Sequence, residues 1–327
     1  MLVLSERDVE ALLDVDALID ALASAMVDLS AGRASVPNRV GAQVQESDGL
    51  LAAMPGYTPS AGALATKLVT LFPRNAGGRL PTHQAVIVVF DPQTGRPEAL
   101  LDGNAITALR TAAGSALATR LLAREDASVL AILGTGVQAR AHGRAVPRVR
   151  GFSEVRVAGR TPAKADELAR ELACDLGLPA RAVASFDEAC DGADVVCATT
   201  HTVEPVVRRV SLKSGAHVTS VGYNAAGREV DDATVAEALL VVESRAAALA
   251  PMPAGSNDLV DAVGRGLVRA EHVHEIGEVL EGRRPGRTSP EQLTLYKSVG
   301  VAVQDGAAAA LVLRAAREAG AGREVEL

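Results

Sequence analysis

Residues 129–140 read VLAILGTGVQAR, an apolar run that leads into a Gly-x-Gly-x-x-Ala pattern. In such a pattern Gly134 permits a tight turn, and Gly136 lets a phosphate approach the backbone. Ala139 allows the next helix to pack closely on the strand, and that helix adds free N–H groups at its N-terminus. A plain strand-to-helix turn can show the same spacing. The position of the motif at the start of a series of strand–helix units favours a dinucleotide-binding site.

The end of the next expected strand carries residues that discriminate between dinucleotides. A site for NAD usually has an acidic residue there, which holds the ribose 2′-hydroxyl. This sequence instead reads VAGRTPAK at 157–164, with Gly159 followed by Arg160 and Thr161. A guanidinium beside a hydroxyl suits a 2′-phosphate, although a solvated arginine at a helix start would look the same. The pattern favours NADPH as the cofactor, with NADH bound more weakly.

Cations stand out in the first third of the chain: Arg39 after VPN, Lys67 in LATKLV and Arg110 in ITALRTAA. Lys67 lies inside an otherwise apolar strand, where an unpaired charge is costly, so we expect it to have an anionic partner. With Thr82 and Thr111 these cations suggest a clamp for a carboxylate. Each of them alone fits a surface or structural ion pair equally well. His83 either lines the same site or has a structural role.

The surrounding sequence predicts an α/β protein with two kinds of organisation. Ser5 is expected to cap a first helix, and residues 14–32 are expected to form a second, amphipathic helix. From residue 39, short apolar runs broken by Gly, Pro, Ser and Asn predict a meander of strands. An Ala-rich helix is expected over 105–123. From residue 129 apolar strands alternate with helices, which indicates a doubly wound parallel sheet of the Rossmann type. Residues 296–320 read as an Ala-rich helix that returns to the first domain.

Composition excludes several classes of protein. The chain has 327 residues and a formal net charge of -7, so it lacks the basic footprint of a nucleic-acid-binding protein. The first residues have too few apolar side chains for a secretory signal or a membrane span. The three cysteines form no CxxC pair and the six histidines show no metal-ligand spacing. We therefore expect a cytoplasmic protein with no metal, membrane or nucleic-acid partner.

Further motifs connect the chain to a known family: MPGY at 54–57, ATKLV at 65–69, VFDPQTGRPEALLDGNAITALRTAAGSALAT at 89–119, LGTGVQAR at 133–140, GYNAAGREVDD at 222–232 and LYKSVGVAVQD at 295–305. Through them the sequence resembles the ornithine cyclodeaminase/mu-crystallin family over nearly its full length. The resemblance implies a homodimer. It also implies a strand-rich α+β substrate-binding and dimerisation domain at 1–118, joined by the C-terminal helix 300–327, and a Rossmann domain at 119–299.

The same resemblance assigns roles to individual residues. Arg39, Lys67 and Arg110 are expected to bind the substrate carboxylate, with Thr82 beside them. The residues expected to contact the cofactor are Thr111, Gly134, Gly136, Val137, Gln138, Arg160, Thr161, Thr199 and Val221.

One departure from the family pattern bears on the reaction. Cyclodeaminases of the family carry Asp at the position of Asn224, where the carboxylate acts as acid and base. An amide has no proton to exchange near neutral pH, so Asn224 cannot take that part. This favours a reductase of a cyclic imino acid, such as pyrroline-2-carboxylate or piperideine-2-carboxylate. Lys67 would then stabilise charge or pass a proton, and Asn224 would hydrogen-bond the imine nitrogen or a water.

Three alternatives stay open at this point. The first is an amino-acid dehydrogenase resembling alanine dehydrogenase, and the second is an ornithine cyclodeaminase. The third is a ligand-binding protein without catalysis, resembling mu-crystallin. The retained Gly-x-Gly-x-x-Ala turn and the three cations argue against the last of these.

Overall fold

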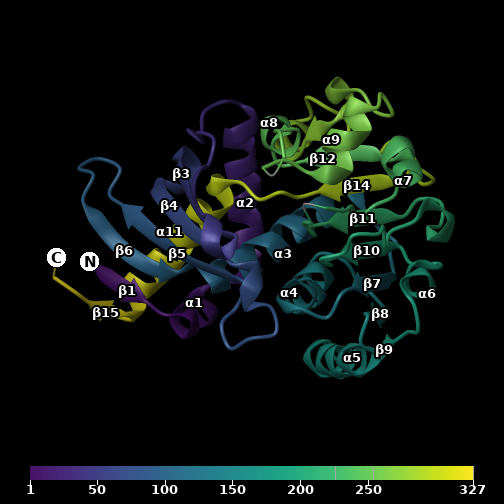
Figure 1. The fold of residues 1–327 in the computed structure, drawn as a ribbon, viewed down its shortest axis with the longest axis horizontal. Helices are drawn as coiled ribbons and strands as arrows, with labels where there is room; N and C mark the ends of the chain where they lie inside the picture. The colour runs from purple at the N-terminus through teal and green to yellow at the C-terminus, as the bar shows by residue number, and fades with distance from the viewer. Residues whose placement is uncertain (225, 253, 327) are drawn as a thin grey trace. The chain divides into compact units, whose positions relative to one another are not determined.

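A computed structural model describes residues 1–224, 226–252 and 254–326, and the chain divides into two compact units (Figure 1). The first unit comprises residues 1–110 and 301–327, and the second comprises residues 111–300. The division falls inside one helix, α3 (Gly103–Leu122), at residue 110 rather than at residue 118. The mixed α/β class expected from the sequence is confirmed.

The first unit is built on a seven-stranded sheet with the order β15-β1-β6-β5-β4-β3-β2. The pairing is antiparallel except between β1 and β6. Its strands are β1 (Leu2–Leu4), β2 (Val40–Val44), β3 (Gly49–Thr58), β4 (Ala63–Leu71), β5 (His83–Phe90), β6 (Pro97–Asp102) and β15 (Arg323–Glu324). The meander predicted from the short apolar runs corresponds to β2–β6.

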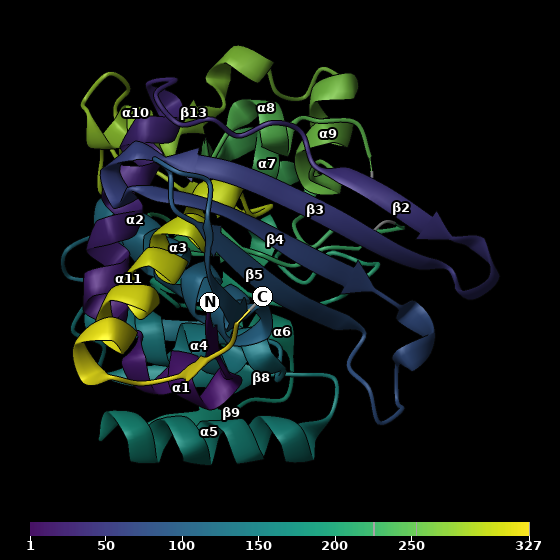
Figure 2. The same cartoon turned by 90° about the vertical axis from the view of Figure 1, so that its left-hand side faces the viewer.

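Helices α1 (Glu6–Leu12), α2 (Val15–Ser30) and α11 (Ala302–Ala319) complete the first unit. The Ser5 side chain caps α1 in a capping box with Asp8, as the sequence suggested, and Asp14 caps α2. Helix α11 packs on α2 and on strands β3 and β4 (Figure 2). The helices therefore cover one face of the sheet.

The two faces of this sheet differ in burial because strand side chains alternate. On β4, Ala65, Lys67 and Val69 are buried on the helix-covered face, whereas Leu64 and Leu68 are partly exposed on the other. Strands β3 and β5 repeat the alternation. The partly or fully exposed side chains of the second face form what we call the open face: Leu51, Ala53, Pro55, Tyr57, Leu64, Thr66, Leu68, Thr70, Val86, Val88 and Phe90. This face is mainly apolar.

The second unit contains an eight-stranded parallel sheet with the order β13-β12-β14-β11-β10-β7-β8-β9. Its strands are β7 (Val129–Leu133), β8 (Glu154–Ala158), β9 (Ala180–Ala182), β10 (Val195–Ala198), β11 (His217–Ser220), β12 (Leu239–Val242), β13 (His274–Glu275) and β14 (Thr294–Lys297). The chain starts at β7, runs outward through β8 and β9, and then returns to β10 on the other side of β7. This reversal is the topological switch point of a doubly wound fold, where such folds bind their ligands.

Helices connect most of these strands: α4 (Val137–Ala145), α5 (Pro162–Leu176), α6 (Phe186–Cys190), α7 (Asp232–Glu237), α8 (Arg245–Ala248), α9 (Asn257–Gly264) and α10 (Ile276–Leu280). The core between helices and sheet is aliphatic, with residues such as Leu133, Val196 and Val218 fully buried. Among the described residues, no helix is both long enough and apolar enough to cross a membrane.

One sequence-based assignment is wrong. Residues 294–297, whose second half was expected to start the C-terminal helix, form β14, a buried strand between β11 and β12. Helix α11 begins only at Ala302. A short apolar run cannot be assigned to helix or strand by periodicity, and here the sheet position decides.

Candidate functional site

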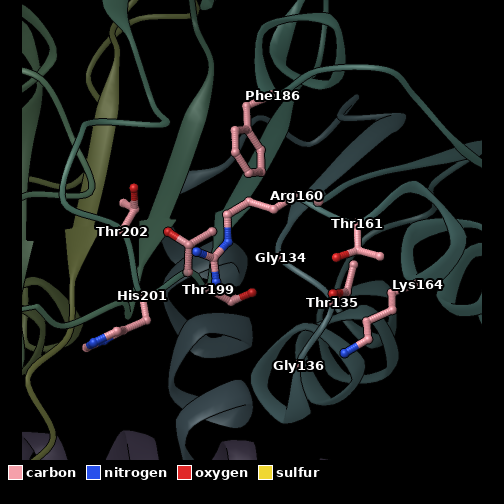
Figure 3. A pocket seen from close by; sticks show the side chains of 12 residues that line it. Gly134, Thr135, Gly136, Arg160, Thr161, Lys164, Phe186, Thr199, His201 and Thr202 are labelled. Atoms are coloured by element: carbon pink, nitrogen blue, oxygen red, sulfur yellow. The ribbon is translucent and has the colours of Figure 1, made fainter. Parts of the chain in front are cut away.

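A pocket of about 350 Å³ lies at the carboxyl ends of β7, β8 and β10 in the second unit (Figure 3). Its lining residues are Gly134, Thr135, Gly136, Gly159, Arg160, Thr161, Lys164, Phe186, Thr199, Thr200, His201 and Thr202. The pocket thus coincides with the switch point of the sheet, and its volume is in the usual range for small-molecule sites.

The glycines of the GTG turn create the floor of this pocket. Gly134 has φ of 119°, and a Cβ there would lie 2.7 Å from the Thr199 hydroxyl oxygen. The Gly134 N–H also donates to the Ala158 carbonyl, so the turn is fixed to the neighbouring strand. Gly136 caps α4 with extended backbone, and a Cβ there would meet no atom within 4 Å. Space and free helix N–H groups therefore coincide in front of Gly136, as a pyrophosphate requires.

The turn after β8 places cationic and hydroxyl groups on the pocket wall. Arg160, Thr161 and Lys164 are exposed and line the pocket (Figure 3). Thr161 is the N-cap residue of α5, yet its side chain makes no capping hydrogen bond. A Cβ on Gly159 would lie 2.6 Å from the Thr135 Cγ2, so a larger side chain at this position would require the Thr135 side chain to move. Lys164 also lines the pocket, although the sequence pattern was not used to predict it as a site residue.

Some of the residues that were expected to contact the cofactor are not among those that line this pocket. Val137 and Gln138 open α4, with Val137 69% exposed. Val221 follows β11 and donates its N–H to the Ala198 carbonyl, whereas Thr111 is buried within α3. Conversely, Thr135, Phe186, Thr200, His201 and Thr202 line the pocket without having been expected. Except for Phe186, these residues lie within four residues of the carboxyl end of β7 or β10, and that position is their common signal.

The first unit holds a buried charge cluster made of Lys67, Arg110 and Asp305. The Lys67 Nζ lies 2.8 Å from one oxygen of Asp305, and the Arg110 Nε lies 3.1 Å from the other. The side chains of Lys67 and Asp305 are only 3% and 2% exposed. Arg110 also donates to the Oε1 of Gln304, at 3.1 Å. The anionic partner expected for Lys67 is thus Asp305, from the first turn of α11.

Burial and charge shift the pKa values in this cluster. Burial lowers the pKa of Lys67 to about 8, with Asp305 opposing the shift and Arg110 adding to it. Burial alone would raise the pKa of Asp305, but the Lys67 and Arg110 charges hold it below its usual value. Asp305 is therefore ionised at neutral pH, and Lys67 can exchange its proton near the physiological range.

Of the other residues expected near the substrate, His83 and Arg39 lie close enough to the charge cluster to interact with it electrostatically. The pKa of His83 is lowered by burial and by Lys67, while a hydrogen bond with Asn104 raises it. Arg39 is exposed, but its charge contributes to the lowered pKa of Lys67. Thr82 is exposed as well, and its carbonyl accepts from the Phe72 N–H.

Asn224 lies in the second unit, on the segment that follows β11. Its Oδ1 accepts the Ala226 N–H at 2.9 Å, and its carbonyl accepts from the Asn257 side chain. The side-chain oxygen is therefore engaged in a local turn.

The fold and these two sets of residues define the class of the protein. It combines a Rossmann dinucleotide-binding unit with an α+β unit that holds the buried charge cluster. The chain belongs to the ornithine cyclodeaminase/mu-crystallin family, whose sequence pattern matches residues 1–320. This confirms the resemblance found in the sequence.

Individual relatives cover almost the whole chain. The ketimine reductase mu-crystallin of Mus musculus is 39% identical over 299 residues, 90% of each chain. The structure of Thermococcus litoralis Delta(1)-pyrroline-2-carboxylate reductase in complex with NADH and L-proline has a TM-score of 0.94 and 37% identity, covering 99% of this chain and 100% of that one. An archaeal alanine dehydrogenase dimer with bound NAD has a TM-score of 0.92 and 30% identity, covering 100% and 99%.

The two glycines of the turn predict separable effects. Gly136→Ala should lower the Tm only slightly, because its Cβ would meet open space and only the N-cap preference for glycine is lost. The same methyl group would occupy the room for a phosphate, so the Kd for a dinucleotide should rise at least about tenfold, or about 1.4 kcal/mol. Nucleotide fluorescence titration and thermal unfolding measure the two effects.

Two further variants complete this test. Gly151→Ala is the matched control, since that glycine is also in open space but lies outside the pocket lining, and it should change neither quantity. Gly134→Ala should lower the Tm through its clash with Thr199. Unchanged nucleotide binding by Gly136→Ala would contradict the assignment of the phosphate position.

Proposed function

We propose that the protein reduces a small cyclic imino acid, of the pyrroline-2-carboxylate or piperideine-2-carboxylate type, to the cyclic amino acid with NADPH as the preferred cofactor. The relatives support this reaction, since they are named as reductases of a ketimine and of Delta(1)-pyrroline-2-carboxylate. Enzymes of this kind act on a C=N bond and are oxidoreductases. The chemistry of this chain's own residues fits that reaction.

The observation that carries the proposal is the charge imbalance of the buried charge cluster. Lys67 and Arg110 bring two positive charges, and Asp305 brings one negative charge. The three side chains of the cluster therefore sum to a net positive charge in a buried place. A buried charge without compensation is costly, and a substrate carboxylate would supply the missing negative charge. Arg110, oriented by Asp305 and Gln304, is suited to bind that carboxylate.

Lys67 is the residue that we assign to proton transfer. Its pKa of about 8 leaves it mainly protonated at neutral pH, yet close enough to the ambient pH to give its proton to a substrate nitrogen. Arg110, with the planar fork of its guanidinium, serves as an anchor for the carboxylate. We assign Asn224 a role in shaping the segment after β11, with its Nδ2 directed to the imine nitrogen or a water.

The pocket of the second unit is suited to hold the cofactor. Gly134, Gly136 and the N-terminus of α4 would bind the pyrophosphate, while Arg160, Thr161 and Lys164 would bind a ribose 2′-phosphate. Of the residues outside this pocket, Thr111, Val137, Gln138 and Val221 are assigned to the cofactor only through the family resemblance. A bound nicotinamide nucleotide supplies the hydride for reduction of the C=N bond.

The same assignment separates the reductase from a cyclodeaminase. Deamination of ornithine requires a group that accepts and returns the proton of an amine, and an amide at Asn224 cannot do so. A reductase needs only a bound carboxylate, a hydride and a proton. We therefore propose the reductase as the activity.

The pH dependence of turnover tests this proposal. The enzyme should oxidise NADPH with Delta(1)-pyrroline-2-carboxylate, and kcat/KM should fall above pH 8 because Lys67 loses its proton there. Lys67→Gln should lower kcat/KM by roughly a hundredfold or more and remove this dependence. Steady-state rates between pH 6 and 10 measure both effects.

A second imine of different ring size provides the control for the pH profile. Its own nitrogen titrates at a different pH, so a decrease that stays near pH 8 with both substrates belongs to the enzyme. A constant kcat/KM up to pH 10 would contradict the role of Lys67. Release of ammonia from ornithine without turnover of either imine would overturn the reductase assignment.

Cofactor preference should depend on the turn after β8. Arg160→Ala should raise the KM for NADPH roughly ten- to a hundredfold, the worth of one hydrogen bond to a charged group, and leave the KM for NADH nearly unchanged. Lys164→Ala should act in the same direction. Arg170→Ala is the matched control, since Arg170 is an exposed arginine on α5 but lies outside the pocket lining. Equal losses with both nucleotides would show that no 2′-phosphate is bound there.

We further propose that the open face of the first unit binds a second copy of the chain, which gives a homodimer. The face is mainly apolar, and contiguous exposed apolar surface is typical of interfaces. The similar archaeal alanine dehydrogenase is described as a dimer.

A charge on the open face tests the dimer. Val86→Lys, at a side chain of the open face that is 39% exposed, should shift the protein to monomers in analytical ultracentrifugation. Val210→Lys, at an 88% exposed valine of the second unit, is the control and should leave the mass unchanged. A monomeric wild-type protein, or a Val86→Lys protein that stays dimeric, would rule out this interface.

A further inference from the structure

The buried carboxylate of Glu229 connects the ends of two neighbouring strands, β10 and β11. One of its oxygens accepts the N–H and the hydroxyl of Thr200, at 2.6 and 2.7 Å. The other accepts the Ser220 hydroxyl at 2.7 Å and the Gly222 N–H at 2.8 Å. Thr200 lines the nucleotide pocket, whereas Glu229 itself does not. The carboxylate of Glu229 can therefore influence the pocket only through residues that it binds, such as Thr200.

A buried ion pair holds the other side of this arrangement. The Lys297 Nζ lies 2.8 Å from a carboxylate oxygen of Asp258, and donates to the Ser220 hydroxyl and the Gly222 carbonyl. The second oxygen of Asp258 accepts the backbone N–H of Glu229 itself. Lys297 and Asp258 therefore fix both the backbone of Glu229 and the hydroxyl that Glu229 binds.

Gly222 shows how closely the strand ends are packed. A Cβ there would lie 2.3 Å from the Glu229 Oε1 and 2.3 Å from the Thr200 carbonyl oxygen. Both the N–H and the carbonyl of Gly222 are engaged, by Glu229 and Lys297 respectively. The path of the chain from β11 towards Asn224 is consequently determined by the same two charged side chains.

We propose that Glu229 is a positioning residue for the cofactor: it fixes Thr200 at the pocket wall and Gly222 at the end of β11, supported by Lys297 and Asp258. The inference rests on the proposed function, since the ligand is the nicotinamide nucleotide. Through these hydrogen bonds, Glu229 holds the loops after β10 and β11 in a fixed position relative to each other. The turn after β8, which carries Arg160 and Lys164, is outside this arrangement, so Glu229 influences affinity for the nucleotide but not the choice between NADPH and NADH.

Equilibrium binding of NADPH and NADH, measured by nucleotide fluorescence without substrate, tests this proposal. Glu229→Gln keeps the size of the side chain but replaces an acceptor oxygen by a donor. We expect the Kd values of both nucleotides to rise on the order of tenfold, with their ratio unchanged. In steady state the KM for the nucleotide should rise while kcat stays within about twofold.

A matched control separates this effect from a general loss of stability. Asp194 is also a buried carboxylate, and it accepts backbone N–H groups of Ser128 and Val129 at the amino end of β10. Asp194→Asn should lower the Tm and leave both Kd values unchanged. A Glu229→Gln protein whose Kd values are those of the wild type, whatever its Tm, would overturn the proposal.

A double-mutant cycle shows whether Glu229 acts through Thr200. Thr200→Val should weaken nucleotide binding by itself, and its combination with Glu229→Gln should cost less than the product of the single effects. Independent, multiplicative effects would overturn the coupling. If Glu229→Gln did not fold, Thr200→Val and Ser220→Ala would carry the test, with a several-fold rise in Kd expected for each and unchanged Kd values excluding the role. A wild-type protein that bound neither nucleotide would instead disprove the proposed function.

Discussion

The organisation of the first unit depends on one interaction, the buried charge cluster of Lys67, Arg110 and Asp305. It connects a strand in the middle of the sheet, a helix that leaves the unit and the first turn of the C-terminal helix. Removing one partner from such a buried arrangement typically costs about 3–5 kcal/mol, because the other charges lose their compensation. Asp305 also lies where a helix dipole favours a negative charge. The C-terminal segment is thereby fixed to strands formed much earlier in the chain.

The second unit follows a different constraint, that of a parallel sheet whose strands all end at one edge. Loops after adjacent strands must meet there, and their backbone groups need partners when they are buried. Glu229 and Lys297 satisfy this need after β10 and β11, and the Gly134 N–H is bound by the neighbouring strand. Polar groups at this edge therefore have two tasks, since they complete the backbone hydrogen bonds and determine the shape of the pocket.

The sequence predicts those features that depend on local pattern. The strand, turn and helix around Gly134 follow from residue types and spacing, and the alternation of strands and helices indicated the parallel sheet. The position of Lys67 within an apolar strand predicted an anionic partner, and this prediction is correct. The identity of that anion could not be derived, because Asp305 is distant in sequence and nothing in its local pattern distinguishes it. Thr200 was missed for a similar reason, since its role depends on which strand ends become neighbours. Lys164 was missed although it lies four residues after Arg160 and belongs to the same local pattern.

The choice of lysine and arginine in the buried charge cluster has a chemical consequence. Both cations face one carboxylate, but only the lysine has a pKa that burial can bring to about 8. In the proposed site, the guanidinium of Arg110 would attract a substrate carboxylate whether or not Lys67 carries its proton. Asp305 limits how far the pKa of Lys67 falls, since its negative charge opposes the effect of burial. A site with two arginines would bind the carboxylate without a proton to transfer, and without Asp305 the pKa of Lys67 would fall further.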